Sequence, residues 1–344
     1  MKLGLIVGTV GKRLELDIER IKFAESLGFH SVWTGEAWGP DAITQAAFVL
    51  AQTETIKVGT SILQMTARAP TCTAQTALTM NQLSGGRFIL GLGVSGPQVV
   101  EGWHGAPFSR PLARTREYID IVRQVFAREA PVTHEGMHYN LPYSGADGMG
   151  LGKSLKCILE ADTSIPIYTA SITPKGLETS AEVADGVIPI WMDPDRFDVL
   201  ASGISKGLAT SSRTLEDYAV APFVRCTLGD DINACRIPAK ANMAFYIGAM
   251  GAKDKNFYTD YAVALGYASE AEEIQDLFLS GKRKEAMLVV PDELVDACHL
   301  VGPEERIRDR LKAWKAANER HEVDELILFC EQPEALQILA DELL

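Results

Sequence analysis

Residues that could carry out chemistry lie directly after short apolar segments of the chain. Glu36 follows the segment at residues 31–34, and its carboxylate could bind a hydroxyl group or move a proton. Burial against an apolar ligand would favour the protonated carboxyl, which suits proton transfer near neutral pH. The alternative is a helix-capping acid or a surface charge. We interpret Glu36 as the candidate catalytic residue.

Two further segments end in residues that could line a ligand site. Ser61 and Ile62 lie at the end of the second segment, at residues 57–63, although their spacing alone favours ordinary strand residues. The next segment runs into Gly-Leu-Gly-Val-Ser-Gly-Pro, where glycine lets a ligand approach the backbone closely. Val94, Ser95 and Gly96 are therefore candidate binding residues, although such a run also marks any turn from a strand to a helix.

A candidate anion site lies before a predicted helix that begins with Pro174. The free backbone N–H groups and the positive end of the helix dipole would favour a phosphate group there. The alternative is a simple N-cap by one of the two hydroxyl residues. The candidate residues are Ala170, Ser171, Ile172 and Thr173.

Histidine and cysteine give weaker signals. His104 lies beside a tryptophan in a glycine-flanked loop and is either catalytic or structural. His134 and His138 are four residues apart with no third ligand after them, so we expect no metal site. The 6 cysteines are scattered without a Cys-x-x-Cys pair, and the start of the chain does not look like an export signal. We therefore expect reduced thiols and a cytoplasmic protein.

The composition limits the class of protein. The chain has 344 residues, of which 47 % are hydrophobic and 23 % charged, which excludes disordered, collagen-like and coiled-coil chains. A net charge of −13 argues against a nucleic-acid partner, whose binding face would be basic. No segment reaches the roughly 20 apolar residues of a membrane span, so we expect no membrane partner.

Strand-like and helix-periodic segments alternate along the chain. Strands are predicted at residues 3–7, 31–34, 57–63, 88–93, 167–170, 187–190, 218–227 and 325–329, and helices at 14–27, 41–52, 71–83, 113–128, 174–184, 195–208, 306–317 and 333–343. This spacing is typical of parallel βαβ units. Eight strands favour a closed (β/α)8 TIM barrel, with an open doubly wound sheet as the alternative.

Two segments do not fit the repeat and are predicted to be insertions after strands 4 and 7. The first, at about 130–165, has no helical period, and the second, at about 230–301, holds several helices where one is expected. We expect a single domain over residues 1–344. In a barrel, the active site lies at the C-terminal ends of the strands, where the candidate residues above are found.

Several segments resemble the luciferase-like flavin- and deazaflavin-dependent oxidoreductases, especially the methylenetetrahydromethanopterin reductase branch. The resemblance covers essentially the whole chain. Its most specific part is Leu-Ser-Gly-Gly-Arg-Phe-Ile-Leu-Gly-Leu-Gly-Val-Ser-Gly at residues 83–96. The segment at residues 290–314, which begins Val-Pro-Asp-Glu-Leu-Val-Asp, is the second.

The resemblance implies a TIM barrel, usually a homodimer, that binds coenzyme F420 at the C-terminal mouth and acts on a small organic substrate. The deazaflavin ring would lie against a bulge after strand 3, often with a non-proline cis peptide, here the Ser61–Ile62 bond. Val94, Ser95 and Gly96 would border the ring, and the loop at 170–173 would take the phosphate.

The chain also departs from relatives of this family. Ala37 stands where many relatives have a histidine beside the acid, so that proton-donor role is not carried over. Gly96 and Gln98 stand where the sugar-dehydrogenase branch has an acid, and Asp193 stands near an expected phosphate-binding lysine. The leading hypothesis is an F420-dependent oxidoreductase. The alternatives are an FMN-dependent monooxygenase that uses reduced flavin and oxygen, and a non-catalytic flavin-binding protein.

Overall fold

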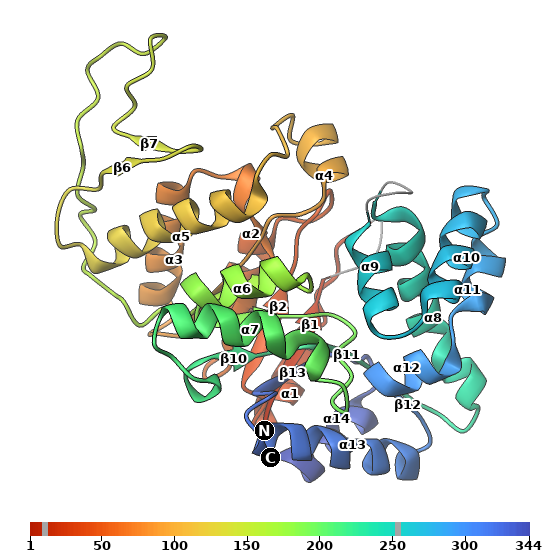
Figure 1. Cartoon of the computed structure of the whole chain (residues 1–344). Coiled ribbons are helices and arrows are strands. Elements are labelled where there is room, and N and C mark those ends of the chain that lie inside the picture. The colour runs from red at the N-terminus through yellow and green to blue at the C-terminus, as the bar shows by residue number, and fades with distance from the viewer. Residues whose placement is uncertain (9–12, 252–255) are drawn as a thin grey trace.

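The computed structural model describes residues 1–8, 13–251 and 256–344 of the chain. Its main sheet is parallel, and its strands follow the order β10-β9-β8-β5-β3-β2-β1-β13-β11-β12, with β4 beside β5. The strands are β1 (Lys2–Val7), β2 (Ser31–Thr34), β3 (Lys57–Thr60), β4 (Leu63–Gln64), β5 (Phe88–Gly93), β8 (Ile167–Ala170), β9 (Gly186–Ile188), β10 (Ala219–Val220), β11 (Phe223–Leu228), β12 (Leu300–Gly302) and β13 (Glu325–Phe329). The chain thus forms an α/β fold around a curled parallel sheet (Figure 1).

Helices surround the sheet (Figure 1). Those between the strands of the first half are α1 (Ile18–Ser26), α2 (Ala42–Gln52), α3 (Pro70–Leu83), α4 (Pro97–Gly102) and α5 (Pro111–Ala127). Those of the second half are α6 (Pro174–Val183), α7 (Asp198–Thr210), α8 (Ile232–Ala249), α9 (Phe257–Ala264), α10 (Ala268–Leu279), α11 (Arg283–Val289), α12 (Asp292–Cys298), α13 (Glu304–Glu319) and α14 (Pro333–Leu343). The sequence predicts most of these helices to within a few residues but not the short helix α4.

Backbone hydrogen bonds continue across the gap between β10 and β11. Ala221 N–H donates to Val187 O at 2.9 Å, and Phe223 N–H donates to Pro189 O at 3.0 Å. The strand predicted at residues 218–227 is therefore present in two pieces, because Pro222 has no N–H to donate to a neighbouring strand. One piece pairs with β9 and the other with β13.

Side chains on the inner face of the sheet form a small core of their own. It consists of Ile6, Trp33, Ile89, Tyr168, Ile188, Ala221 and Ile327. Trp33 stacks on Tyr168 with ring centroids 5.8 Å apart. Glu325 lies buried near Trp33, whose Nε1 donates to its carboxyl at 3.4 Å, and burial raises the pKa of Glu325. The outer face packs against the helices through alternate residues such as Leu3 and Leu5.

The segment between α5 and β8 projects from the body of the protein (Figure 1). It contains a two-stranded antiparallel hairpin, β6 (His134–Glu135) and β7 (Asn140–Leu141), where the sequence predicts only irregular structure. The Glu117 carboxylate on α5 holds it by accepting backbone N–H groups of Met137, His138 and Tyr139 at 2.9–3.1 Å.

The segment between β11 and β12 forms a cluster of helices, α8 to α12, beside the sheet (Figure 1). Trp191, which follows β9, contacts this cluster through two tyrosine rings. The centroid of its ring lies 6.1 Å from that of Tyr246 and 5.8 Å from that of Tyr258. The multi-helical prediction for this segment is confirmed, apart from residues 252–255, which lie outside the described part of the chain. The three-residue strand β12 is too short to show as a sequence pattern.

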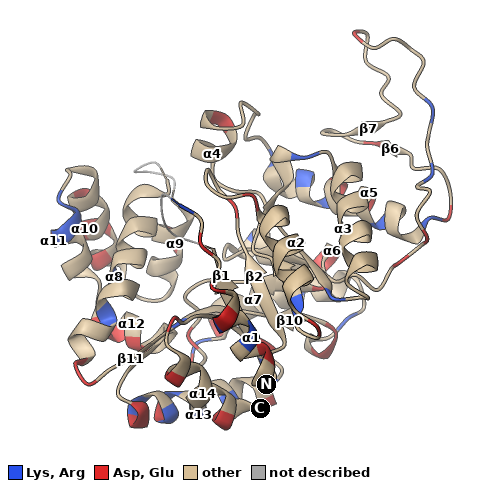
Figure 2. Cartoon of the chain, turned by 180° about the vertical axis from the view of Figure 1, so that it is seen from behind, with Lys and Arg blue, Asp and Glu red and all other residues tan. Residues whose placement is uncertain are grey.

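Charged residues are mixed on the outer helices. Figure 2 shows acidic and basic residues on α13, whereas the charged residues of α14 are all acidic. Glu342 of α14, for example, accepts bonds from Arg308 and from Lys315 of α13, the latter at 2.7 Å. Across the described ranges, no helix combines the length and apolar character needed to cross a membrane.

Candidate functional site

The predicted site residues follow four strands that are neighbours in the sheet, in the order β8-β5-β3-β2. Glu36 lies two residues beyond β2, and Ser61 directly follows β3. The residues 94–96 follow β5, and residues 171–173 follow β8. Because parallel strands end at the same edge of a sheet, the structure brings all of these candidates to one edge.

The chain forms a bulge after β3. The Ser61–Ile62 peptide bond is cis, as predicted from the family resemblance. Pairing with β5 resumes at Leu63, so the predicted strand at 57–63 is interrupted at residues 61–62. Glycine on β5 makes room for this path. A Cβ atom at Gly91 would lie 1.7 Å from Thr60 O, and one at Gly93 would lie 2.6 Å from Ile62 Cγ1.

The Ser61 side chain is a buried polar group without a partner. Its Oγ atom has no hydrogen bond in the described structure, although the Ser61 backbone N–H donates to Thr34 O at 2.6 Å. Buried hydroxyl groups in proteins almost always have a partner, so an orphaned one needs an explanation. A polar ligand atom beside the bulge would supply that partner.

Glu36 holds several segments of this edge together. Its carboxylate accepts two bonds from the Arg68 guanidinium, at 2.6 and 3.3 Å. It also accepts the backbone N–H groups of Gln64 at 2.9 Å and Ala42 at 3.2 Å. Its side chain is only 7 % exposed. These four bonds point to a positioning role, whereas proton transfer by Glu36 stays a prediction.

Gln64, which the sequence does not single out, connects three of the strand ends. Its Oε1 accepts hydrogen bonds from Ser95 Oγ and from His104 Nε2, both at 3.0 Å. Its Nε2 donates to Ala37 O at 2.7 Å. Because Oε1 is an acceptor, the neutral His104 ring carries its proton on Nε2. His104 is therefore oriented at the site edge, and its catalytic role stays a prediction.

The loop at 170–173 leads into α6 with unused donors. The backbone N–H groups of Ser171, Ile172 and Thr173 have no acceptor among the described residues. Thr173 is the N-cap, and its hydroxyl accepts Gly176 N–H at 3.1 Å. A Cβ at Gly176 would lie 2.1 Å from Ser171 Oγ, so only glycine lets both hydroxyls lie against the first helical turn. The N-cap alternative is correct for Thr173, and the remaining donors still suit an anion.

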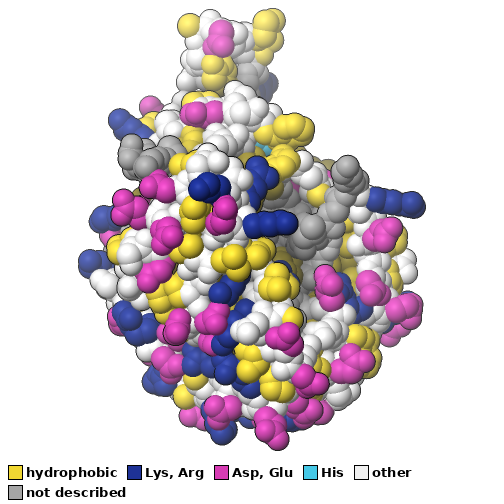
Figure 3. Space-filling view, turned by 90° about the vertical axis from the view of Figure 1, so that its right-hand side faces the viewer, with side chains coloured by type: hydrophobic (Ala, Val, Ile, Leu, Met, Phe, Trp, Pro, Cys, Tyr) yellow, Lys and Arg dark blue, Asp and Glu magenta, His cyan; other side chains and the backbone are white. Residues whose placement is uncertain are grey.

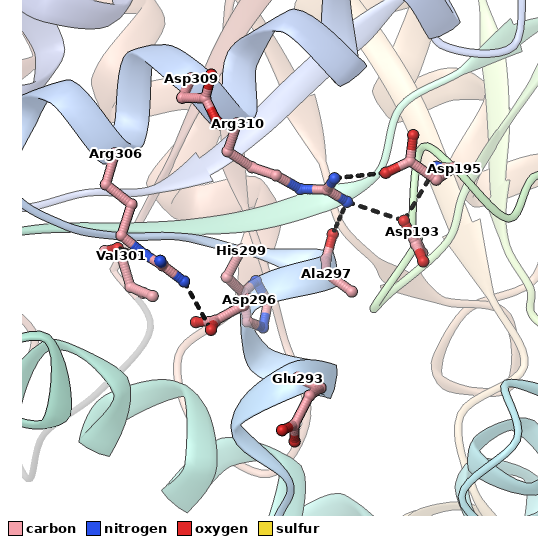
Figure 4. Close-up of a pocket in the computed structure, with 10 residues that line it drawn as sticks. All are labelled: Asp193, Asp195, Glu293, Asp296, Ala297, His299, Val301, Arg306, Asp309 and Arg310. Atoms are coloured by element: carbon pink, nitrogen blue, oxygen red, sulfur yellow. Dashed lines mark hydrogen bonds and ion pairs between the residues drawn. The ribbon is translucent and has the colours of Figure 1, made fainter.

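Asp193 does not lie at this edge. It borders a cavity of about 320 Å3 between the 193–195 loop, α12 and α13 (Figure 4). Arg310 Nη2 donates to Asp193 at 2.9 Å and also to Ala297 O at 2.6 Å. The acid that stands near the expected lysine is thus part of an ion pair on the outer layer of the fold.

The chain is similar to known proteins over most of its length. The family model for the luciferase-like monooxygenases matches residues 7–320. A Mycobacterium tuberculosis protein whose name assigns it to the coenzyme F420-dependent oxidoreductases is 45 % identical over 323 residues, covering 92 % of each chain. The 5,10-methylenetetrahydromethanopterin reductase of Archaeoglobus fulgidus is 26 % identical over 345 residues, covering 100 % of this chain and 99 % of the reductase.

A solved structure has the same fold. The coenzyme F420-dependent tetrahydromethanopterin reductase of Methanopyrus kandleri superposes with a TM-score of 0.78 at 21 % identity. The match covers 99 % of this chain and 97 % of the reductase, so the fold is shared over the full length. The family match over residues 7–320 and the 45 % identical relative show that the chain belongs to the luciferase-like monooxygenase family, as the resemblance in its sequence predicts.

Proposed function

We propose that the chain is a coenzyme F420-dependent oxidoreductase that transfers a hydride between the deazaflavin and a small organic substrate. The observation that carries this proposal is the N-terminus of α6, where three backbone N–H groups and two hydroxyls are available to a phosphate. It lies on the same sheet edge as the bulge at Ser61–Ile62. The 45 % identical relative, named for F420, favours this cofactor over FMN.

The residues present fit such a cofactor. Ser61 offers an orphaned hydroxyl at the bulge, and Gly176 leaves a cradle that a side chain would fill. We assign Ser61, Ile62, Val94, Ser95 and Gly96 to the ring, and the loop at 170–173 to the phosphate. When bound, the deazaflavin supplies the hydride-carrying ring carbon.

The chain's own residues then have to position the reactants and exclude water. Glu36 and Arg68 fix the loop after β2 against β4, and Gln64 fixes the orientation of Ser95 and His104. The exposed Trp38 and Trp103, on the loops after β2 and β5, provide apolar surface beside the edge. His104 holds a proton on Nε2, directed at Gln64, and its Nδ1 is the ring atom left to exchange a proton.

We also propose that the sheet is a closed (β/α)8 barrel with insertions after the fourth and seventh strands. Each strand from β1 through β9 pairs with the next, apart from the hairpin strands β6 and β7 and with β4 beside β5. The β10–β11 stretch then pairs with both β9 and β13, and β13 pairs with β1. This pairing supports closure.

A homodimer is the proposed assembly, and the cytoplasm the proposed location. The projecting segment carries exposed apolar side chains, which Figure 3 shows at the top of the molecule. Met149, Leu151, Leu155 and Ile158 are 76–92 % exposed, and several exposed apolar side chains on one segment are typical of interaction sites. The thiols of all 6 cysteines are free, which supports a reducing compartment. Sedimentation analysis of the purified chain tests the dimer.

The experiment that tests the function is a titration of the purified apoprotein with F420 and with FMN. We expect F420 to bind at least about tenfold more tightly, a difference of about 1.4 kcal/mol. Tighter binding of FMN would instead support a flavin-dependent monooxygenase, the activity after which the matching family is described. Measurement of both affinities by quenching of cofactor fluorescence separates the two functions.

A further inference from the structure

A second cavity opens at the ends of strands that the proposed cofactor residues do not use. It has a volume of about 170 Å3 and lies at the ends of β1 and β13 and beside β11. Its lining includes Arg13, Arg20, Arg225, Phe329 and Glu331. The proposed cofactor residues lie after β3, β5 and β8, so the two sets of residues occupy different parts of the same sheet edge.

Arg225 is the central charged residue of this cavity. Along β11, Val224 and Cys226 are buried among the outer-layer core, whereas Phe223 packs against the inner core, so Arg225 also faces inward. Its guanidinium carbon lies 5.2 Å from the centroid of the Phe329 ring. Its backbone N–H donates to His299 Nδ1 at 3.1 Å, which fixes the strand at this point.

No carboxylate among the described residues forms an ion pair with the Arg225 guanidinium, although the charge of the nearby Glu331 acts on it. Within the described ranges, the guanidinium donates no hydrogen bond, and only the Phe329 ring lies against it. Burial lowers the pKa of Arg225, which shows the cost of holding this charge away from water. Half-buried arginine is usually paired, because burying an unpaired charge is unfavourable.

Arg20 places a second unpaired guanidinium in the same cavity. Its Nη1 donates to Cys330 O at 3.3 Å, while its Nε is buried and has no partner in the part of the chain that the structure describes. The acids that line the cavity, Glu15 and Glu331, lie at its exposed rim. Glu15 is 3.9 Å from Arg13, and the two side chains are 82 % and 90 % exposed. The interior of the cavity is therefore cationic in a chain whose net charge is −13.

We propose that Arg225, assisted by Arg20, binds an oxyanion of the substrate, a carboxylate or a phosphate ester. The proposal rests on the proposed function, because it places the substrate beside the cofactor residues at the strand ends. An oxyanion would supply the acceptors that both guanidinium groups lack, and Arg is suited to hold two of its oxygens at once. The cavity has room for the anionic group and a few carbon atoms, so the substrate is a small organic anion.

The test uses the full chain loaded with F420 and two probes, inorganic phosphate and acetate, at constant ionic strength. Calorimetric titration should show millimolar binding of at least one probe and none of neutral acetamide. Arg225→Gln should weaken probe binding by at least about tenfold. Arg225→Lys should retain part of the probe affinity, because it keeps the positive charge. Arg283→Gln is the matched control, and its probe affinity should stay unchanged because that side chain is exposed at the start of α11 and does not line the cavity. The probe that binds more tightly shows whether the substrate's anionic group is a phosphate ester or a carboxylate.

The outcomes separate this inference from the proposed function. Equal probe affinity in the native chain and in Arg225→Gln, or no probe binding by the native chain, would overturn the oxyanion site even if F420 binds normally. Loss of probe binding in Arg225→Gln with unchanged F420 affinity and circular dichroism supports the site. If F420 fails to bind the native apoprotein while probe binding still depends on Arg225, the proposed function falls and the oxyanion site stands.

Discussion

The ion pair between Glu36 and Arg68 should contribute measurably to the stability of the site edge. The two side chains are 7 % and 21 % exposed, and the guanidinium makes two bonds to the carboxylate. Breaking a buried pair costs about 3–5 kcal/mol because one charge is left without compensation. Arg68 retains a second carboxylate, Asp41, which reduces this cost. The backbone N–H groups of Ala42 and Gln64 would lose their acceptor, at about 1 kcal/mol each.

We therefore expect Glu36→Ala to lower the free energy of unfolding by about 3–4 kcal/mol and Arg68→Ala by about 2–3 kcal/mol. Urea denaturation followed by circular dichroism measures both losses and that of the double variant. Because the two residues contact each other, the double variant should lose at least about 1 kcal/mol less than the sum of the single losses. Glu54→Ala is the control, since that exposed side chain makes no bond in the described structure, and it should change stability by less than about 0.5 kcal/mol.

Additive losses, within about 0.5 kcal/mol, would show that the pair does not couple and that the positioning role of Glu36 is wrong. Glu36→Gln addresses catalysis separately, because it keeps the shape of the side chain and removes its titration. A stable Gln variant with normal cofactor affinity and turnover reduced by roughly 10²–10⁴-fold would establish proton transfer by Glu36. Near-normal turnover, with the loss confined to stability, would leave Glu36 with the positioning role alone.

Three further predictions concern other described residues. Burial lowers the pKa of His299 to about 3, so between about pH 6.5 and pH 3 the unfolded chain binds a proton on this ring and the folded chain does not. The free energy of unfolding should therefore fall as the pH falls from about 6.5 to 3. His299→Gln should flatten this pH dependence in urea titrations. Burial raises the pKa of Glu325, so the free energy of unfolding falls as the pH rises above about 4.5. Glu325→Gln should therefore raise the midpoint of urea unfolding at pH 8 but not at pH 4. An unchanged midpoint at both pH values would contradict the burial argument. Gly176→Ala should weaken F420 binding by about tenfold or more, because the new Cβ would displace Ser171 Oγ. The same Cβ would crowd the N-cap hydroxyl of Thr173, so we also expect a stability loss of about 1 kcal/mol. Unchanged F420 affinity in fluorescence titration would contradict the proposed phosphate site at the start of α6.

The parts of the fold that the sequence predicts are those determined by local pattern. The strands at 88–93 and 325–329 have the predicted bounds, since each is a continuous apolar run with clear turn signals at its ends. The strand at 57–63 is interrupted because the bulge depends on space left by β5, which lies 30 residues further along the chain. Glycine at positions 91 and 93, inside a strand, is the signal that would have revealed this close approach.

The site is less predictable, because its contacts join residues far apart in the sequence. Arg68 is not distinguished by any motif, yet it binds the acid that the sequence does single out. Gln64 lies in a segment that the sequence interprets as the end of a strand, and only the fold places it between Ser95 and His104. The sequence also does not reveal that Arg225 lacks an ion-pair partner, because only the fold determines which carboxylates lie close to it.

The two parts of the sheet edge differ in a way that suits a hydride transfer. Around β3, β5 and β8, the available groups are backbone N–H donors and hydroxyls, and the acid Glu36 is neutralised by Arg68. Around β1, β11 and β13, the available groups are the guanidinium groups of Arg20 and Arg225, which form no ion pair among the described residues. A flat, largely apolar ring is best held by these neutral N–H and hydroxyl donors, since they place no net charge beside it. A small organic anion is best held by the guanidinium groups. The separation of the two kinds of group would therefore orient the substrate, with its charged end at Arg225 and its reacting end toward the bulge.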